Sequence, residues 1–475
     1  MAGGLIAAVG VRLIEVSHSA LHYQPTRQFF SALIAREIYL DHFSNASASA
    51  RAIAALARPT GIEPPVAETL AALMFWAVGG EHLWIPRLVA ALVWVAGVVP
   101  LWLLVTRLLS RRAAFVSSAF YLFIPLGVVA SGSFLPDPWT VTAQLWAVLA
   151  VVVYQQEPRR RHLLLAAAAA GVATVLKLQS AFILLPVFVA TSIGRSGWKR
   201  GLLAWQTALL VLITLLPAGA WYLSRPGPGS VYFLPGYFFT PEFWSGWATQ
   251  VTTAVGLFTA LGVVLAVLLW ARGLTRSLMI GWLLGYLALA FAFNYRIATH
   301  DYYSLPLIPL VAAGMGLIVD TRGRLRRAIV AAAVANTFVL LAVWLLTAFV
   351  SLSAAPTDAA TIDAYRAAGN LVHHDSAMIA LSPGYGLPFD YYGHVAVVDW
   401  PHEADLDLAA RAGHPYRGAT ASLDKLIRVQ RASWFVVLDA PELDRQADLK
   451  EILFSRYRQV RGDGFLLFDL SQSAN

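Results

Sequence analysis

The chain has 475 residues, of which 58% are hydrophobic and only 13% are charged, and its mean hydropathy is +0.62. Soluble domains carry about a quarter charged residues, so this composition excludes an ordinary soluble protein and indicates a chain that crosses a membrane many times. The formal net charge of +8 does not indicate nucleic-acid binding, because the basic residues lie in short loops beside apolar runs.

The first predicted element is a short apolar helix over residues 3–16. We interpret it as a transmembrane segment, because no convincing signal-peptide cleavage site follows it. Ten further apolar runs are long enough to cross a bilayer: 84–106, 112–131, 139–156, 162–176, 179–194, 201–223, 250–271, 277–294, 303–319 and 328–352. The sequence therefore predicts a polytopic α-helical membrane protein with about 11 transmembrane helices. Lys177 and Gln179 interrupt the run from 162 to 194, which predicts two short helices that meet at the outer face.

The loops between these runs alternate between two compositions. One set is short and rich in arginine, as at 159–161, whereas the other carries aromatic, acidic, histidine and proline residues, as in FLPDPW (134–139) and HDYYSLP (300–306). Arginine-rich loops remain in the cytoplasm. We therefore expect a cytoplasmic N-terminus, with the motif-bearing loops and the C-terminal part on the outer side of the cytoplasmic membrane.

The first outer loop, residues 17–83, is long. Segments 27–40 and 66–78 are predicted as two interfacial helices, joined by the small-residue linker SNASASA. A later outer loop, 224–249, begins RPGPG and is rich in aromatic residues. Two interpretations of that loop are compatible: an aromatic belt at the lipid headgroups, or a mobile cover over a lipid or sugar site.

From about residue 355 the composition becomes that of a soluble domain. Predicted strands are 377–381, 395–399, 433–439 and the final GFLLFDL; predicted helices are 358–373, 404–412, 419–431 and 441–455. The segment 385–393 is predicted as a loop, which either packs within the domain or faces a substrate. We therefore expect a membrane domain over 1–354, which includes the outer loop, and a small extracytoplasmic α/β domain over 355–475.

Ionisable residues at the membrane edge are costly and mark candidate sites. HDYYSLP places His300, Asp301, Tyr302 and Tyr303 where a span begins, with Arg296 just before them. His300 can protonate near neutral pH, and the tyrosines offer hydroxyl donors. Such a group can hold a lipid phosphate or pyrophosphate; the alternative is an interfacial tyrosine pair beside a solvated histidine.

Glu63 stands directly before Pro64 and Pro65, which hold its backbone stiff. Sugar transfer onto a hydroxyl needs a base, and a positioned carboxylate supplies one. The alternative is a carboxylate that only complements the dipole of the following helix.

Asp137 and Lys177 are the next candidates. Asp137 could assist Glu63, bind a sugar hydroxyl or help to hold a divalent ion; alternatively, it is the N-cap of the next helix. Lys177 could bind an anion or could instead snorkel to the interface.

Arg27 and Arg36 lie nine residues apart on the first interfacial helix. We expect them to project from similar faces, where their guanidinium forks could bind a substrate phosphate or, alternatively, anionic headgroups.

No cysteine is present, which excludes a Cys-ligated metal and a thiol nucleophile. The sequence also contains no glycine-rich nucleotide loop, histidine-rich metal motif or serine nucleophile elbow. Nucleotides would also lie on the wrong side of the membrane, so an activated lipid is the expected donor.

The combination resembles the GT-C superfamily of membrane glycosyltransferases, and within it the bacterial branch related to protein O-mannosyltransferases and to the aminoarabinose transferases of lipid A. The motifs that carry the resemblance are PTRQFFSALIARE (25–37), IEPP (62–65), GGEHLWIPRL (79–88), FLPDPW (134–139) and HDYYSLPLIP (300–309). The resemblance implies a polyprenyl-phosphate sugar as donor and inversion at the sugar carbon. It does not imply a metal, and no cofactor is expected, although a divalent metal is possible. It also implies an acidic residue before the arginine of the first helix. Here Gln24, Pro25 and Thr26 stand there instead, which leaves Glu63 as the base or the enzyme divergent or inactive.

The leading hypothesis is a glycosyltransferase of the inner membrane that acts on a cell-envelope glycan, lipid or protein. A transporter or flippase of lipid-linked sugars is a second hypothesis, which the concentration of polar residues at one face disfavours. A non-catalytic envelope scaffold is the third.

Overall fold

The computed structural model describes residues 2–224, 233–321, 331, 335, 339, 342, 343, 346, 356–374, 378–411, 413, 414, 416 and 418–473. By packing, the chain divides into two compact units. Unit 1 comprises Met1–Ser17, Ile62–Val66 and Arg87–Phe349; unit 2 comprises His18–Gly61, Ala67–Pro86 and Val350–Asn475. Most of the first outer loop is thus grouped with the C-terminal residues, whereas the sequence analysis assigned it to the membrane domain.

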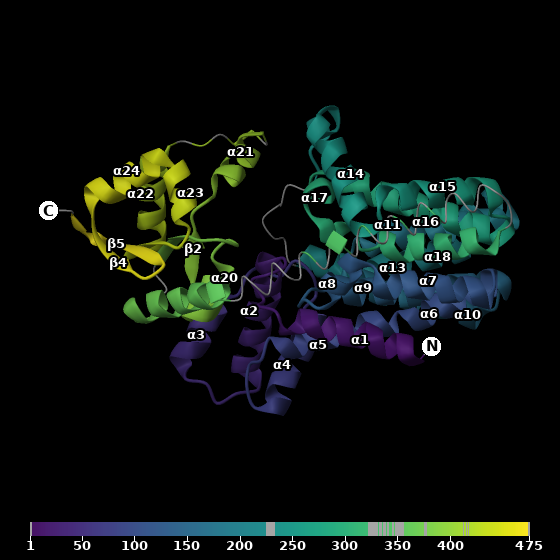
Figure 1. Cartoon of the computed structure of the whole chain (residues 1–475), viewed down its shortest axis with the longest axis horizontal. Helices are drawn as coiled ribbons and strands as arrows, with labels where there is room; N and C mark the ends of the chain where they lie inside the picture. Colours follow the sequence, from purple (N-terminus) through teal and green to yellow (C-terminus); the bar gives the residue numbers. More distant parts are fainter. Residues whose placement is uncertain are drawn as a thin grey trace. The chain divides into compact units, whose positions relative to one another are not determined.

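Unit 1 is a bundle of apolar helices. Its helices are α1 (Ala2–Ser17), α5 (Trp84–Ala96, from Arg87 onward), α6 (Val98–Leu108), α7 (Arg111–Phe123), α8 (Pro125–Ser131), α9 (Asp137–Gln156), α10 (Arg160–Leu176), α11 (Ser180–Ser196), α12 (Trp198–Leu203), α13 (Trp205–Ser224), α14 (Pro241–Val255), α15 (Leu257–Trp270), α16 (Gly273–Ala292), α17 (Asn294–Thr299) and α18 (Leu307–Asp320), with the 3-10 turns η1 (Pro235–Phe239) and η2 (Asp301–Ser304). Figure 1 shows the long helices running side by side, with α9 against α10 and α11 against α16.

The described residues contain three helices that are long and apolar enough to span a membrane, or five if each of two bent pairs counts as one span. The sequence predicted about 11 spans. The difference arises because several predicted spans are short, such as α11 and α18, and because the run 328–352 lies almost entirely outside the described residues.

Proline and glycine break two of the predicted spans. The run 112–131 is two helices, α7 and α8, bent by 56° where Pro125 begins the second. The run 250–271 is the end of α14 followed by α15, bent by 84° at Gly256, whose φ of 79° favours glycine. In contrast, the predicted pair of short helices on either side of Lys177 is observed as α10 and α11.

Close packing of α11 on α16 depends on two small residues. A Cβ added at Gly281 would lie 2.7 Å from the carbonyl oxygen of Pro186, and one at Gly285 would lie 2.7 Å from that of Phe182. Glycines four residues apart on one helix face let membrane helices approach at backbone distance. This contact fixes α11, which begins beside Lys177, against the body of unit 1.

Unit 2 contains the outer-loop helices α2 (Pro25–His42), α3 (Ala48–Ala57) and α4 (Val66–Val78, from Ala67 onward). Two of them match the predicted interfacial helices. The predicted linker is not a linker throughout, because Ser47 caps α3 by accepting a hydrogen bond from the Ala50 N–H.

The rest of unit 2 is an α/β fold. Its strands are β1 (Met378–Leu381), β2 (Val397–Asp399), β3 (Trp434–Val437), β4 (Tyr457–Gly462) and β5 (Phe465–Ser473), in the order β2-β1-β3-β5-β4. The strands β2, β1 and β3 are parallel, whereas β5 is antiparallel to β3 and β4. The helices are residues 356–371, α20 (Leu387–Gly393), α21 (Glu403–Arg411), α22 (Ala419–Gln430), α23 (Ala440–Arg445) and α24 (Ala447–Arg456). Apolar side chains fill both faces of this sheet.

Two elements of unit 2 differ from the prediction. The segment 385–393, predicted as a loop, forms the helix α20, which starts with Pro388 in its first turn. Strand β4 was not predicted, because three of its six residues are exposed arginine or glutamine and Val460 is its only aliphatic residue, which gives no apolar signal. Helix α2 packs against α20, and the Phe29 ring lies 5.4 Å from Tyr391 and 5.3 Å from Tyr392 (centroid distances).

Candidate functional site

The centre of the candidate site is a buried ion pair between Lys177 and Asp137. The Lys177 Nζ lies 2.7 Å from Asp137 Oδ1, and the two side chains are only 7% and 6% exposed. Asp137 occupies the first turn of α9 and Lys177 follows the last residue of α10, so each charge complements a helix dipole.

This pairing decides between earlier alternatives. Pro136, not Asp137, is the N-cap of α9, and the cap makes no side-chain hydrogen bond, so the N-cap interpretation of Asp137 is wrong. Lys177 is buried rather than snorkelling to an interface.

Two tyrosine rings enclose the Lys177 ammonium. Its Nζ lies 5.2 Å from the Tyr302 ring centroid and 4.9 Å from that of Tyr303, within cation–π range. Both tyrosines belong to η2, which is fixed by a hydrogen-bond chain: Trp247 Nε1 donates to the Tyr286 hydroxyl, which bonds the buried Ser304 hydroxyl. The predicted tyrosine pair therefore lies over the predicted lysine.

Arg296 and His300 extend the site toward α17. The Arg296 Nη1 lies 3.3 Å from His300 Nε2. Burial, together with the charges of Arg296 and Lys177, lowers the pKa of His300 to about 4. The expectation that His300 can protonate near neutral pH is therefore wrong: at pH 7 it is a neutral hydrogen-bonding group, and Lys177 and Arg296 supply the positive charge.

A narrow cavity opens beside the ion pair. It is lined by Asp137, Thr140, Val141, Gln144, Lys177, Gln179, Ser180, Leu289, Tyr302, Tyr303 and Pro306. Four of the predicted site residues thus meet at one cavity. Sequence reasoning missed Gln144 and Ser180, because a single polar residue inside a helix is common and carries no motif.

Two other predicted residues of unit 1 lie apart from this lining. Glu63 is half-buried and precedes Pro64 and Pro65 at the start of α4. Asp301 is half-buried at the first position of η2. Neither lines the cavity, so their catalytic and binding roles stay predictions.

Arg27 and Arg36 belong to unit 2. Nine residues are about two and a half helical turns, so the two side chains leave α2 on opposite sides, and the expectation of a shared face is wrong. Arg27 lies over the Phe30 ring, 5.0 Å from its centroid.

Arg36 is buried in a fixed network within unit 2. Its Nε lies 2.8 Å from Glu81 Oε2, its Nη1 donates to the Tyr391 carbonyl oxygen over 2.6 Å, and its guanidinium lies 3.7 Å from the Tyr391 ring centroid. Burial opposes the charge, but Glu81 and Tyr391 more than offset this and hold the pKa of Arg36 above its ordinary value. These contacts give Arg36 a structural role within unit 2, and its substrate-binding role stays a prediction.

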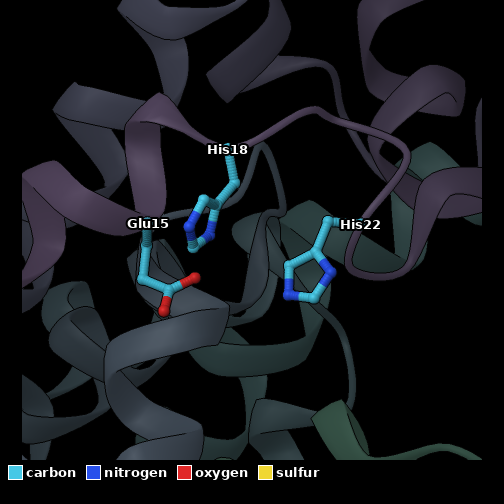
Figure 2. Close-up of side chains that lie close together, drawn as sticks. All are labelled: Glu15, His18 and His22. Atoms are coloured by element: carbon cyan, nitrogen blue, oxygen red, sulfur yellow. The ribbon is translucent and has the colours of Figure 1, made fainter. Parts of the chain in front are cut away.

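A histidine pair lies at the start of unit 2. Figure 2 shows His18 and His22, whose ring centroids are 5.4 Å apart, together with Glu15, which comes three residues earlier in the chain. The spacing Glu-x-x-His-x-x-x-His was not singled out in the sequence. Two imidazoles by themselves do not define a metal site, and we assign none to this pair.

Comparisons with known proteins bear on this geometry. The sequence profile of the family described as dolichyl-phosphate-mannose-protein mannosyltransferase matches residues 62–221, which include Asp137 and Lys177. The chain has the GT-C fold. Its structure aligns with ArnT from Cupriavidus metallidurans in the apo state with a TM-score of 0.58 and 16% identity, covering 98% of this chain and 96% of ArnT.

Further GT-C structures are similar over most of this chain. ArnT bound to undecaprenyl phosphate aligns with a TM-score of 0.56, 16% identity, and coverage of 98% and 97%. The archaeal oligosaccharyltransferase AglB from Archaeoglobus fulgidus aligns with a TM-score of 0.54, 12% identity, and coverage of 98% of this chain and 74% of AglB. No curated protein sequence matches the chain. The chain therefore resembles GT-C membrane glycosyltransferases of the mannosyltransferase and aminoarabinose transferase type.

Proposed function

We propose that this chain is a glycosyltransferase that moves a sugar from a polyprenyl-phosphate donor to a cell-envelope acceptor. The observation that carries the proposal is the buried Lys177, held by Asp137 and enclosed by Tyr302 and Tyr303. A cation kept in a water-poor site attracts a phosphate more strongly than a solvated one. The match to a dolichyl-phosphate-mannose family and the fold shared with ArnT, solved with undecaprenyl phosphate, support the same donor chemistry.

The reaction needs charge stabilisation at the leaving group. The acceptor hydroxyl forms a bond to the anomeric carbon while the bond from that carbon to the phosphate oxygen breaks, so negative charge develops on the departing polyprenyl phosphate. Lys177 is placed to stabilise this charge, and Arg296 adds a second cation. The tyrosine hydroxyls are hydrogen-bond donors for the same oxygens, whereas neutral His300 accepts from Arg296 through Nε2 and so positions that guanidinium.

A base must take the acceptor proton. Asp137 is a poor candidate, because its Oδ1 is already paired with Lys177. We therefore assign the proton to Glu63, whose backbone is held by two following prolines. Attack opposite to the leaving phosphate gives inversion at the sugar carbon.

The proposed side of the membrane follows from the loop charges. Arginine-rich loops are expected in the cytoplasm and the HDYYSLP and FLPDPW loops on the outer side. The acceptor is then a glycan, lipid or protein of the cell envelope, and the enzyme acts at the outer face of the cytoplasmic membrane.

Lipid binding by a lysine variant tests the proposal. Lys177→Gln in the full chain, reconstituted in nanodiscs, should weaken binding of undecaprenyl phosphate about tenfold or more, because a charge-assisted contact is worth roughly 1.5–3 kcal/mol. Because Asp137 would be left unpaired, the double variant Asp137→Asn/Lys177→Gln is measured beside it.

The matched control is Lys199→Gln, which removes the same charge from an exposed position in α12. It should leave the affinity unchanged. If both Lys177 variants fold and bind undecaprenyl phosphate as tightly as the wild type, the proposed donor site is wrong.

A further inference from the structure

The cavity beside Lys177 is rich in hydrogen-bond acceptors. Within the described residues, Asp137 Oδ2, Gln144 Oε1 and Gln179 Oε1 are buried atoms that accept no hydrogen bond, and all three side chains line the cavity. Gln144 and Asp137 are almost fully buried, at 2% and 5% exposure. Buried acceptors without a donor are costly, so a group that donates to them would be held firmly.

The hydrogen bonds of Ser180 fix the orientation of the Gln144 amide. The Ser180 hydroxyl lies 2.9 Å from the Ala173 carbonyl oxygen, to which it can only donate. Its single hydrogen is thereby used, so it must accept from the Gln144 side-chain atom 3.0 Å away, and that atom must be Nε2. The other end of the amide, Oε1, is then the acceptor left for a ligand.

The size and charge of the cavity determine which kind of hydrogen-bond donor it can hold. Its interior space is about 20 Å³, and about 310 Å³ with its open mouth. Because about 10–15 Å³ holds one water-sized group, a hydroxyl fits inside and a ring remains at the mouth. The charged lining residues, Asp137 and Lys177, cancel each other, so the site favours neutral hydroxyl donors over a cation.

We propose that this cavity recognises the donor's sugar: one sugar hydroxyl enters it and donates to Gln144 Oε1, and the neighbouring hydroxyl, at the mouth, donates to Asp137 Oδ2, with Gln179 at the half-buried side. The inference rests on the proposed function, because the sugar reaches the cavity attached to the phosphate that Lys177 holds. In this proposal the two carboxylate oxygens of Asp137 have different roles. Oδ1 positions Lys177, and Oδ2 accepts a hydrogen bond from the sugar. Gln144 becomes a specificity residue.

Paired binding measurements test the inference. The wild-type chain in nanodiscs is titrated with undecaprenyl phosphate, undecaprenyl-phosphate mannose and the arabinofuranose equivalent, and sugar selectivity is the ratio of the Kd values without and with the sugar. Gln144→Met keeps the length of the side chain and removes its acceptor. It should reduce selectivity for the preferred sugar about five- to tenfold, the value of one hydrogen bond to a buried acceptor. Binding of the sugar-free lipid should stay within about twofold.

A second glutamine of α9 supplies the matched control. Gln155 is also buried, and its Nε2 donates to Thr191 and Ser192. It lies eleven residues further along the helix, roughly 16 Å away, and does not line the cavity. Gln155→Met should therefore leave the selectivity unchanged, even if it lowers stability.

The outcomes separate the inference from the proposed function. A wild type that binds no polyprenyl phosphate contradicts the proposed function itself. The inference is wrong, and the cavity holds only water, if the wild type binds undecaprenyl phosphate with the same affinity whether or not a sugar is attached. It is also wrong if Gln144→Met keeps the full sugar selectivity of the wild type. Donors lacking one ring hydroxyl add an independent arm: removal of the recognised hydroxyl should weaken wild-type binding and leave Gln144→Met unaffected.

Discussion

Lys177 and Asp137 form a buried ion pair whose geometry is more easily explained by ligand binding than by stability. Removing two charges from water costs several kcal/mol for each ion, and an apolar pair of similar volume is often as stable. Here the lysine also lies under two tyrosine rings at the edge of a cavity. The proposed donor site therefore rests on a buried charge with a high desolvation cost, which lies beside a cavity whose hydrogen-bond acceptors have no donor.

Glu63→Gln tests the assignment of the base. The amide keeps the shape of the side chain but cannot take a proton at neutral pH, so sugar transfer should fall by about 100-fold or more. Binding of the lipid-linked sugar should stay unchanged, because Glu63 does not line the cavity. Turnover and Kd are measured on the same preparation, and unchanged turnover would remove Glu63 from the mechanism.

Sequence patterns located part of the site. Asp137, Lys177, Tyr302 and Tyr303 were predicted from polar residues at the ends of apolar runs, and the structure places all four at one cavity. Gln144 could not be predicted, because its importance depends on the cavity and on the hydrogen bond that it donates to Ser180 of a different helix. The pKa of His300 also depends on burial and on Lys177, which is more than one hundred residues away in sequence.

At the scale of elements, helix α2 is tied to the C-terminal fold of unit 2. Arg36 bridges Glu81 and the Tyr391 carbonyl oxygen, and the Tyr391 hydroxyl donates to Glu81 over 3.2 Å. The Phe29 ring, which is on α2 like Arg36, packs against the Tyr391 ring of α20. The outer-loop helix α2 is therefore a structural part of the α/β fold. Its contacts join residues that are far apart in the sequence, so no sequence pattern could predict them.

Arg36→Met should destabilise unit 2 by about 3–5 kcal/mol, because it leaves Glu81 partly buried without its cation. The double variant Arg36→Met/Glu81→Gln should recover part of this loss. Thermal unfolding followed by fluorescence measures both.

Arg58→Met is the control for this effect, since Arg58 pairs with Glu37 on the same outer loop but is more exposed, at 28%. It should cost less than about 1 kcal/mol. If Arg36→Met costs no more than Arg58→Met, the network does not hold α2 in place.

Proline and glycine determine where several helices begin or bend. Pro64 and Pro65 stand directly before α4, and Pro138 lies in the first turn of α9, positions at which proline favours the start of a helix. The bends at Pro125 and Gly256 were missed, because the apolar runs continue through them without a change in composition. Helix α3 was not predicted, because the alanine and serine residues at its start are as typical of a linker as of a helix.

At the scale of the whole molecule, composition and loop chemistry were enough to predict a helical membrane protein. The resemblance to the GT-C superfamily came from the motifs, and the structural similarities agree with that fold. The grouping of the outer loop with the C-terminal residues was not predictable, because it depends on long-range contacts such as that of α2 with α20. Sugar and acceptor identity depend on side-chain geometry that no motif encodes.

Native mass spectrometry tests the central claim most directly. The full chain is purified in detergent, incubated with an equimolar mixture of undecaprenyl phosphate, its mannose-linked form and an ordinary phospholipid, and then released from the micelle in the instrument. The wild type should retain one undecaprenyl-phosphate lipid in preference to the phospholipid, and Asp137→Asn/Lys177→Gln should lose it. Retention of phospholipid alone by the wild type, or an unchanged lipid adduct in the variant, would contradict the donor site proposed for this chain.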